Sequence, residues 1–127
     1  MDNLTTYLRV GAFIELETEL FNNTEVVNKY LAVLEYSEDT LYQLKLANIY
    51  SWFVALKSFV IQNEEFGHHD VLGLLRSWEE LYLQMEDVVE EIESPNTTWL
   101  STAYERYESL HQTVDRMFRE HYSELKP

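Results

Sequence analysis

The sequence predicts an all-α fold, a compact bundle of four to five antiparallel helices, with residues 1–127 forming a single domain. Helix breakers are scarce, since the 127 residues include three glycines and two prolines. No Asn-Gly or Asp-Gly pair occurs, although two-residue β-hairpin turns strongly favour such pairs. Between the few breakers, apolar residues recur at the spacing of an amphipathic helix. With 46% hydrophobic residues, a chain of this length can fill one core.

Residues 3–21 and 25–35 are expected to form the first two helices. The cluster Asn22-Asn23-Thr24 predicts a break between them, because Asn and Thr side chains compete for backbone hydrogen bonds. Thr24 is then expected to cap the second helix. The predicted apolar stripe of the first helix contains Leu4, Leu8 and Ala12.

The third expected helix, residues 38–65, is apolar on most of its faces. Ser37 can cap it, the acids that follow suit the positive end of a helix dipole, and Gly67 is its expected stop. A helix that is apolar nearly all round is normally central in its bundle. The alternative is that one face meets a partner or a second copy of the chain. Its predicted stripe is Leu46, Ile49, Tyr50, Phe53, Leu56 and Val60.

Two further helices are expected at residues 70–93 and 98–125. Asp70 is the predicted cap of the first, and Ser94-Pro95 ends it because the residue before proline avoids helical angles. The stripe of residues 70–93 is Val71, Leu74, Leu75, Trp78, Leu81, Tyr82, Met85, Val88, Val89 and Ile92. The stripe of residues 98–125 is Leu100, Ala103, Tyr107, Leu110, Val114 and Met117.

Composition excludes several classes of protein. The chain has no cysteine, which rules out disulfides and thiolate chemistry. We see neither a signal peptide nor an uninterrupted apolar run of membrane-spanning length, so we expect a cytoplasmic protein without a membrane partner. No glycine-rich phosphate loop and no nucleophile elbow is present.

The net charge is the most unusual property. Twenty-three acids against nine bases give −14, a charge that repels nucleic acid and attracts basic surfaces. Seven acids and no base lie between residues 79 and 93. Acids near the end of a helix are unfavourable, which indicates a partner-binding surface, although an ordinary solvated face is the alternative. The candidate surface consists of Glu79, Glu80, Glu86, Asp87, Glu90, Glu91 and Glu93.

Two Glu-x-x-His pairs, Glu65/His68 and Glu108/His111, resemble the carboxylate pattern of ferritin-like di-iron proteins. That resemblance implies a lone acid from each of the other helices, with Glu15 or Glu19 and Glu79 or Glu86 as candidates. The glutamates lie on polar faces of their predicted helices, so we predict no metal site and no cofactor. The local run of residues 64–70 could hold a single adventitious divalent ion.

Arg116 and His121 match the Arg-x4-His spacing of HEPN-type helical ribonucleases. The resemblance implies that His121 is the acid/base and Arg116 the phosphate contact, on a late helix at a dimer interface. The alternative interpretation of His121 is a partly buried histidine on the stripe of its helix.

Three functional hypotheses follow. The leading one is a non-catalytic protein that neutralises or occludes a basic partner, such as a toxin or nuclease, as an immunity protein, antitoxin or nucleic-acid mimic does. It predicts no direct contact with nucleic acid. The first alternative is the ribonuclease activity of Arg116 and His121. The second is a structural subunit or adaptor that pairs with a helical chain or forms a homodimer.

Overall fold

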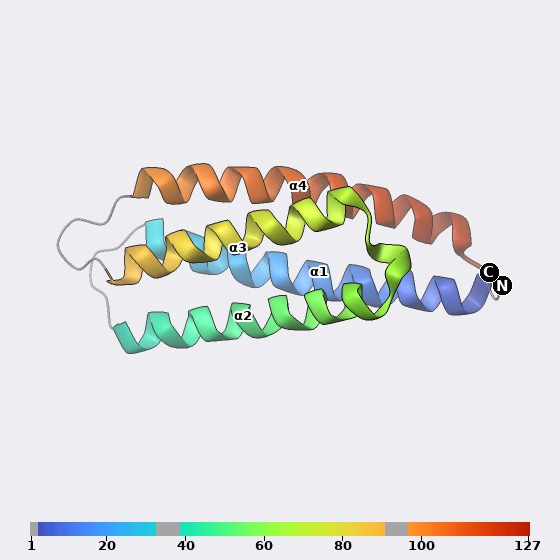
Figure 1. Cartoon of the computed structure of the whole chain (residues 1–127), viewed down its shortest axis with the longest axis horizontal. Helices are drawn as coiled ribbons and strands as arrows, with labels where there is room; N and C mark the ends of the chain where they lie inside the picture. Colours follow the sequence, from blue (N-terminus) through green and yellow to red (C-terminus); the bar gives the residue numbers. More distant parts are fainter. Residues whose placement is uncertain (1–2, 33–38, 91–96) are drawn as a thin grey trace.

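The computed structural model describes residues 3–32, 39–90 and 97–127, which form four long helices and one short 3-10 helix without a strand. The long helices are α1 (Asn3–Ala32), α2 (Asp39–Gln62), α3 (His69–Glu90) and α4 (Thr97–Leu125), and the short one is η1 (Glu64–Phe66). They run up, down, up and down along one long axis, so the two chain ends lie at the same end of the bundle (Figure 1). The predicted all-α bundle is therefore confirmed.

A seven-residue repeat of buried side chains explains this arrangement. The buried residues of α2 are spaced four and three apart: Tyr42, Leu46, Ile49, Phe53, Leu56 and Val60. Nearly straight, antiparallel helices pack along such a stripe, each helix contacting mainly its two adjacent neighbours, while α1 also touches α3 across the bundle. Consecutive helices are neighbours, α1 also packs on α4, and α2 lies diagonally opposite α4. The stripes predicted for α3 and α4 are confirmed in the described residues.

Helix α1 is continuous through Asn22-Asn23-Thr24, so the predicted break and the predicted Thr24 cap are wrong. The amide of Asn23 donates to the Glu19 carbonyl (2.7 Å), and buried Thr24 accepts a hydrogen bond from the Trp78 indole N–H (3.0 Å). Because these side chains have partners that leave the helical backbone intact, they do not end the helix.

The stripe predicted for the beginning of α1 is also wrong, since Leu4 and Leu8 are 53% and 61% exposed. The buried side of α1 instead repeats every three or four residues and includes two polar positions, Glu17 and Thr24. Its members are Val10, Phe13, Glu17, Leu20, Thr24, Val27 and Leu31.

The connection between α2 and α3 differs in detail from the prediction. Helix α2 ends at Gln62 rather than at residue 65, and the Asn63 amide donates to the Phe59 carbonyl (2.8 Å). The Gly67 N–H then closes η1 by donating to the Glu64 carbonyl. His68, and not Asp70, caps α3, because its ring Nδ1 accepts the Asp70 backbone N–H (3.2 Å). The predicted boundaries at residues 35–38 and 93–96 lie outside the described residues.

Helix α2 is not the central helix, contrary to the prediction. Its outer side exposes Leu44, Tyr50, Val54 and Ile61. In a four-helix bundle every helix turns only one side inward, so additional apolar residues remain at the surface. Residues Tyr42–Gln62 are also long and apolar enough to cross a membrane by length and composition alone, although no uninterrupted apolar run was expected there. Core helices of packed bundles meet the same criterion.

Candidate functional site

Two of the predicted surface acids are paired with basic residues of neighbouring helices. Glu79 lies 3.6 Å from Lys57 of α2, and Glu80 accepts a hydrogen bond from Arg106 of α4 (3.0 Å). The two pairs lie on opposite edges of α3. The acids of α3 therefore do not share one outward face, and exposed pairs of this kind contribute little to stability.

The remaining described acids of the predicted surface form no ion pair with a described basic residue. Glu86 is half-buried beside α2, whereas Asp87 and Glu90 are exposed. Glu91 and Glu93 lie outside the described residues. Among the described residues, the acids of the predicted surface that form no such ion pair are thus Glu86, Asp87 and Glu90.

A groove between α2 and α3, lined by both apolar and polar side chains, lies next to these acids. Its floor contains Phe53 and Trp78, whose rings stack 4.3 Å apart. Burial, followed by the charge of Glu86, raises the pKa of Tyr82 in this groove. The groove is lined by Tyr50, Val54, Ile61, Tyr82 and Leu83, with Lys57, Ser58, Glu79 and Glu86 at its polar positions.

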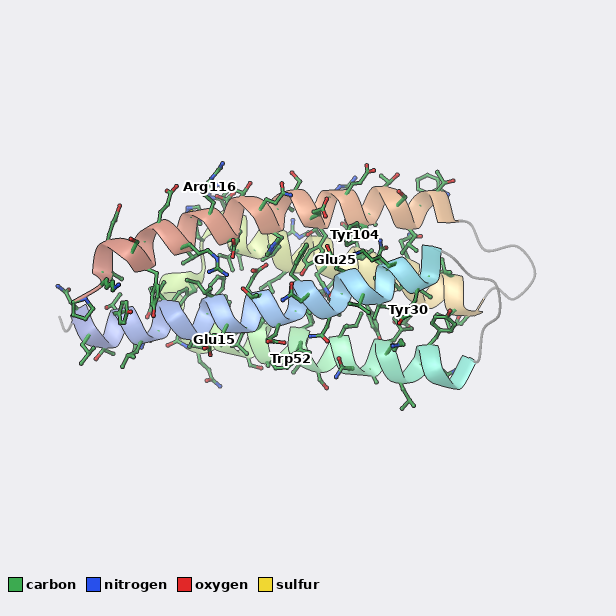
Figure 2. All side chains as sticks on the ribbon, turned by 180° about the vertical axis from the view of Figure 1, so that it is seen from behind. Glu15, Glu25, Tyr30, Trp52, Tyr104 and Arg116 are labelled. Carbon is green, nitrogen blue, oxygen red and sulfur yellow. The ribbon has the colours of Figure 1, made fainter. Side chains whose placement is uncertain are left out.

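The structure does not bring Arg116 and His121 together. Arg116 is exposed and points away from the bundle (Figure 2). His121 lines a hollow near the chain ends beside Phe66 and His68, and Arg116 is not part of that hollow. Five residues along a helix correspond to a rotation of about 140°, which separates the two side chains. The alternative of a partly buried His121 is wrong as well, because this residue is exposed.

The first Glu-x-x-His pair is split by the end of α2. Glu65 lies in η1 and binds Arg9 (2.9 Å), while His68 caps α3. His68, His69 and Asp70 do place possible ligand atoms within 4.8 Å of one another, at the surface. This matches the small local cluster anticipated within residues 64–70.

The second pair is separated differently. The Glu108 carboxylate accepts a hydrogen bond from the Tyr104 hydroxyl (3.2 Å), and His111 turns instead toward Glu17 of α1. Glu17 is 1% exposed, whereas Glu15 and Glu19, the acids that sequence reasoning favoured, are exposed. The buried acid of α1 was therefore missed. The sequence feature that could have identified Glu17 is its position in the seven-residue repeat of buried side chains.

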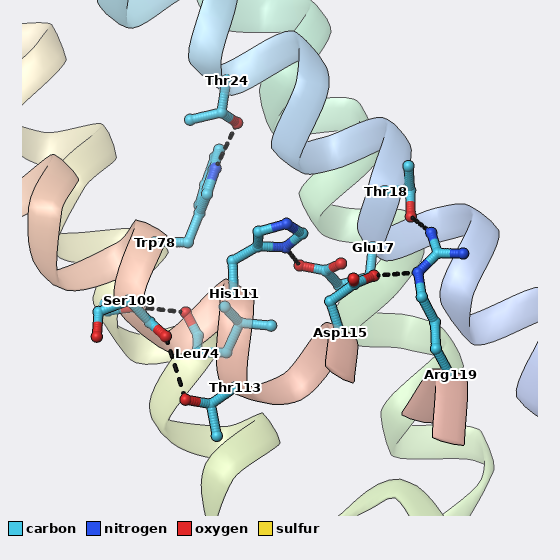
Figure 3. Close-up of polar contacts among 11 residues, drawn as sticks. Glu17, Thr18, Thr24, Leu74, Trp78, Ser109, His111, Thr113, Asp115 and Arg119 are labelled. Carbon is cyan, nitrogen blue, oxygen red and sulfur yellow. Dashed lines mark hydrogen bonds and ion pairs between the residues drawn. The ribbon is translucent and has the colours of Figure 1, made fainter. Parts of the chain in front are cut away.

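The Glu17 and His111 side chains are largely shielded from solvent, being 2% and 12% exposed (Figure 3). Burial raises the pKa of Glu17, and the hydrogen bond and charge of His111 oppose this effect. The ring of Phe21 stacks on the His111 ring at 3.7 Å, which fixes its orientation. Buried histidine–carboxylate pairs of this kind can hold a proton or a cation.

Asp115 lies one turn after His111 and connects the pair to the surface. Arg119 donates to one Asp115 carboxylate oxygen (2.8 Å) and to the Thr18 hydroxyl (3.2 Å). One ligand atom from each of Glu17, His111 and Asp115 lies within 4.8 Å of the others. Sequence spacing alone places His111 and Asp115 one turn apart on α4, but it cannot identify the third member, since Glu17 comes from a distant part of the chain.

Comparison of this chain with protein-family models, curated proteins and solved structures found no match.

Proposed function

We propose that the protein is a non-catalytic binding protein that takes up a basic, amphipathic helix of a partner protein in the groove between α2 and α3. The observation that supports this most directly is an exposed apolar surface bordered by carboxylates. Amphipathic helices bind by laying their apolar side into such grooves, and their flanking residues set specificity.

The apolar part of the proposal rests on α2. Val54 and Ile61 of α2 and Leu83 of α3 are 44%, 69% and 60% exposed, and all three line the groove. Covering apolar surface contributes about 25 cal/mol for each Å² removed from water. A partner helix with a matching stripe would therefore gain most of its binding free energy here.

The electrostatic part concerns the sign of the partner's charge. Glu86 borders the groove on α3, and Asp87 and Glu90 follow along the same helix. Lys57, which lines the groove, is already paired with Glu79. With a net charge of −14, the protein attracts basic helices and repels acidic ones, including a second copy of itself.

The role that fits this binding mode is occlusion. Basic amphipathic segments are common in proteins that contact nucleic acid, and a segment held in the groove is no longer available to a phosphate backbone. The proposal therefore keeps the class of cytoplasmic immunity protein, antitoxin or mimic inhibitor. It moves the contact from the outer side of α3 to the edge that α3 shares with α2.

A matched pair of synthetic peptides tests the proposal. Both have about 20 residues with the same leucine stripe, and one carries lysine and arginine on its flanks where the other carries glutamate. We expect fluorescence anisotropy to show binding of the basic peptide alone. Its affinity should fall steeply between about 50 and about 500 mM salt, where screening shortens the reach of charges.

Variants of exposed residues locate the binding surface without disturbing the fold. Ile61→Gln and Leu83→Gln should each weaken peptide binding, and Glu86→Gln should reduce its salt dependence. Leu72→Gln is the matched control, because Leu72 is also exposed on α3 but does not line the groove. Equal binding of the two peptides, or equal loss in the control variant, would refute the proposal. So would salt-resistant dimerisation that Ile61→Gln abolishes, since a second copy would then occupy the groove.

A further inference from the structure

Three potential metal ligands from two helices meet at the interface of α1 and α4. Glu17 comes from α1, and His111 and Asp115 follow one another by one turn on α4. Figure 3 shows the three side chains directed toward a common point, with the His111 ring nitrogen Nδ1 against the Glu17 carboxylate. Residues four apart share one face of a helix, so α4 can present both of its ligands to α1 at once.

One buried oxygen of this cluster has no hydrogen-bond partner among the described residues. The side chain of Glu17 is 2% exposed, and its second oxygen, Oε2, is buried without a hydrogen-bond partner in the described part of the chain. Buried polar atoms normally have partners, and a carboxylate oxygen without one destabilises the folded state.

Glu17 lies at a position of α1 where an apolar side chain would be expected. It occupies a site in the repeat of buried residues of α1 where the neighbouring members Phe13 and Leu20 are apolar. Replacing a buried charged pair by well-packed apolar residues often stabilises a protein. A glutamate at such a site, with one oxygen unsatisfied among the described residues, therefore points to a ligand for that oxygen.

We propose that Glu17, His111 and Asp115 bind a single divalent transition-metal ion, with Zn²⁺ as the preferred ion. One imidazole nitrogen and two carboxylates form a donor set that zinc accepts, and three protein ligands leave a coordination position for water. Arg119 holds one oxygen of Asp115 and leaves the other for the ion, while Phe21 fixes the imidazole ring. Such outer contacts normally orient metal ligands.

The site is independent of the proposed partner surface. In the bundle, the interface of α1 and α4 lies on the side opposite the groove between α2 and α3. An ion bound there would link α1 to α4 and stabilise the folded chain, because a ligand that binds only the folded state raises the melting temperature.

The experiment uses the full chain after treatment with a chelator. Calorimetric titration with ZnCl2 should give one ion per chain and a concentration-dependent rise in melting temperature, and Co²⁺ should give the visible absorption of a protein-bound ion. Asp115→Asn and His111→Gln should weaken zinc binding by more than about 10-fold, since losing a ligand costs at least as much as losing an outer contact. Asp115 is partly exposed, so this variant should retain the fold, which circular dichroism verifies.

The double variant His68→Ala/His69→Ala is the control, because it removes the exposed cluster that offers the same kinds of ligand. We expect it to bind zinc with unchanged affinity. The proposal is overturned if this control loses the ion while His111→Gln keeps it. It is also overturned if none of Zn²⁺, Co²⁺ and Mn²⁺ raises the melting temperature, in which case Glu17 and His111 form a buried hydrogen bond only. Neither result bears on peptide binding in the groove.

Discussion

Replacing Thr24 by valine tests whether the hydrogen bond between Thr24 and Trp78 stabilises the bundle. Thr24 is completely buried and its hydroxyl accepts the Trp78 indole N–H at 3.0 Å. Valine has nearly the same shape and is also β-branched, so packing and helix propensity change little. The substitution therefore removes the acceptor of the Trp78 N–H, together with the hydroxyl that faces Tyr107, at nearly constant side-chain shape.

The expected magnitude follows from the burial of both partners. Trp78 is 1% exposed, so its N–H cannot turn to water when the acceptor is removed. Leaving a buried donor unsatisfied costs about 1–3 kcal/mol of unfolding free energy. For a domain of this size, that corresponds to a decrease in melting temperature of roughly 3–12 °C.

Urea denaturation, monitored by circular dichroism, measures this change. Thr24→Ser should retain the hydrogen bond and lose only a methyl group. Thr102→Val on α4 is the matched control, because exposed Thr102 bonds only to the carbonyl of its own helix, and we expect a change below about 0.5 kcal/mol. If Thr24→Val is as stable as the control, the buried bond does not hold α1 against α3 and the reasoning is refuted.

Three further predictions follow from individual contacts. Gly73→Ala should raise the unfolding free energy by about 0.5–1 kcal/mol, because a Cβ at residue 73 meets no atom within 4 Å. Gly11→Ala should gain less, because a Cβ at residue 11 would lie 3.2 Å from the Tyr122 ring. Equal gains of the two variants in urea denaturation would contradict this. Burial raises the pKa of Tyr107 well above 10, so the folded state retains that proton and stability should fall as pH rises above about 10. In an alkaline absorbance titration, a Tyr107 phenolate formed before unfolding would disprove this, and Tyr107→Phe should make the fall shallower, with the rest coming from tyrosines such as Tyr82 and Tyr104, whose pKa values burial also raises. Arg106→Ala should change stability by less than about 1 kcal/mol, because its bond to Glu80 is exposed; a larger loss in thermal denaturation would show that the pair is more important than its exposure indicates.

The sequence by itself determined the helical class and most of the buried surface. The apolar repeats of α2, α3 and α4 predicted buried residues such as Leu46, Leu81 and Val114, and the structure confirms them. These predictions succeed because the side of a helix that a residue occupies depends only on its spacing along the chain. The prediction that α2 is central failed, because hydrophobicity around a helix does not show how many neighbours cover it.

Only the tertiary structure decided what the polar residues of α1 do. Glu17 and Thr24 find their partners 94 and 54 residues away, in His111 and Trp78. A polar side chain inside a helix has the same local sequence signal whether it faces water or a distant partner. The continuity of α1 and the cluster of Glu17, His111 and Asp115 could therefore be recognised only after α3 and α4 had been placed against α1, since pairing depends on packing between helices and not on helical periodicity.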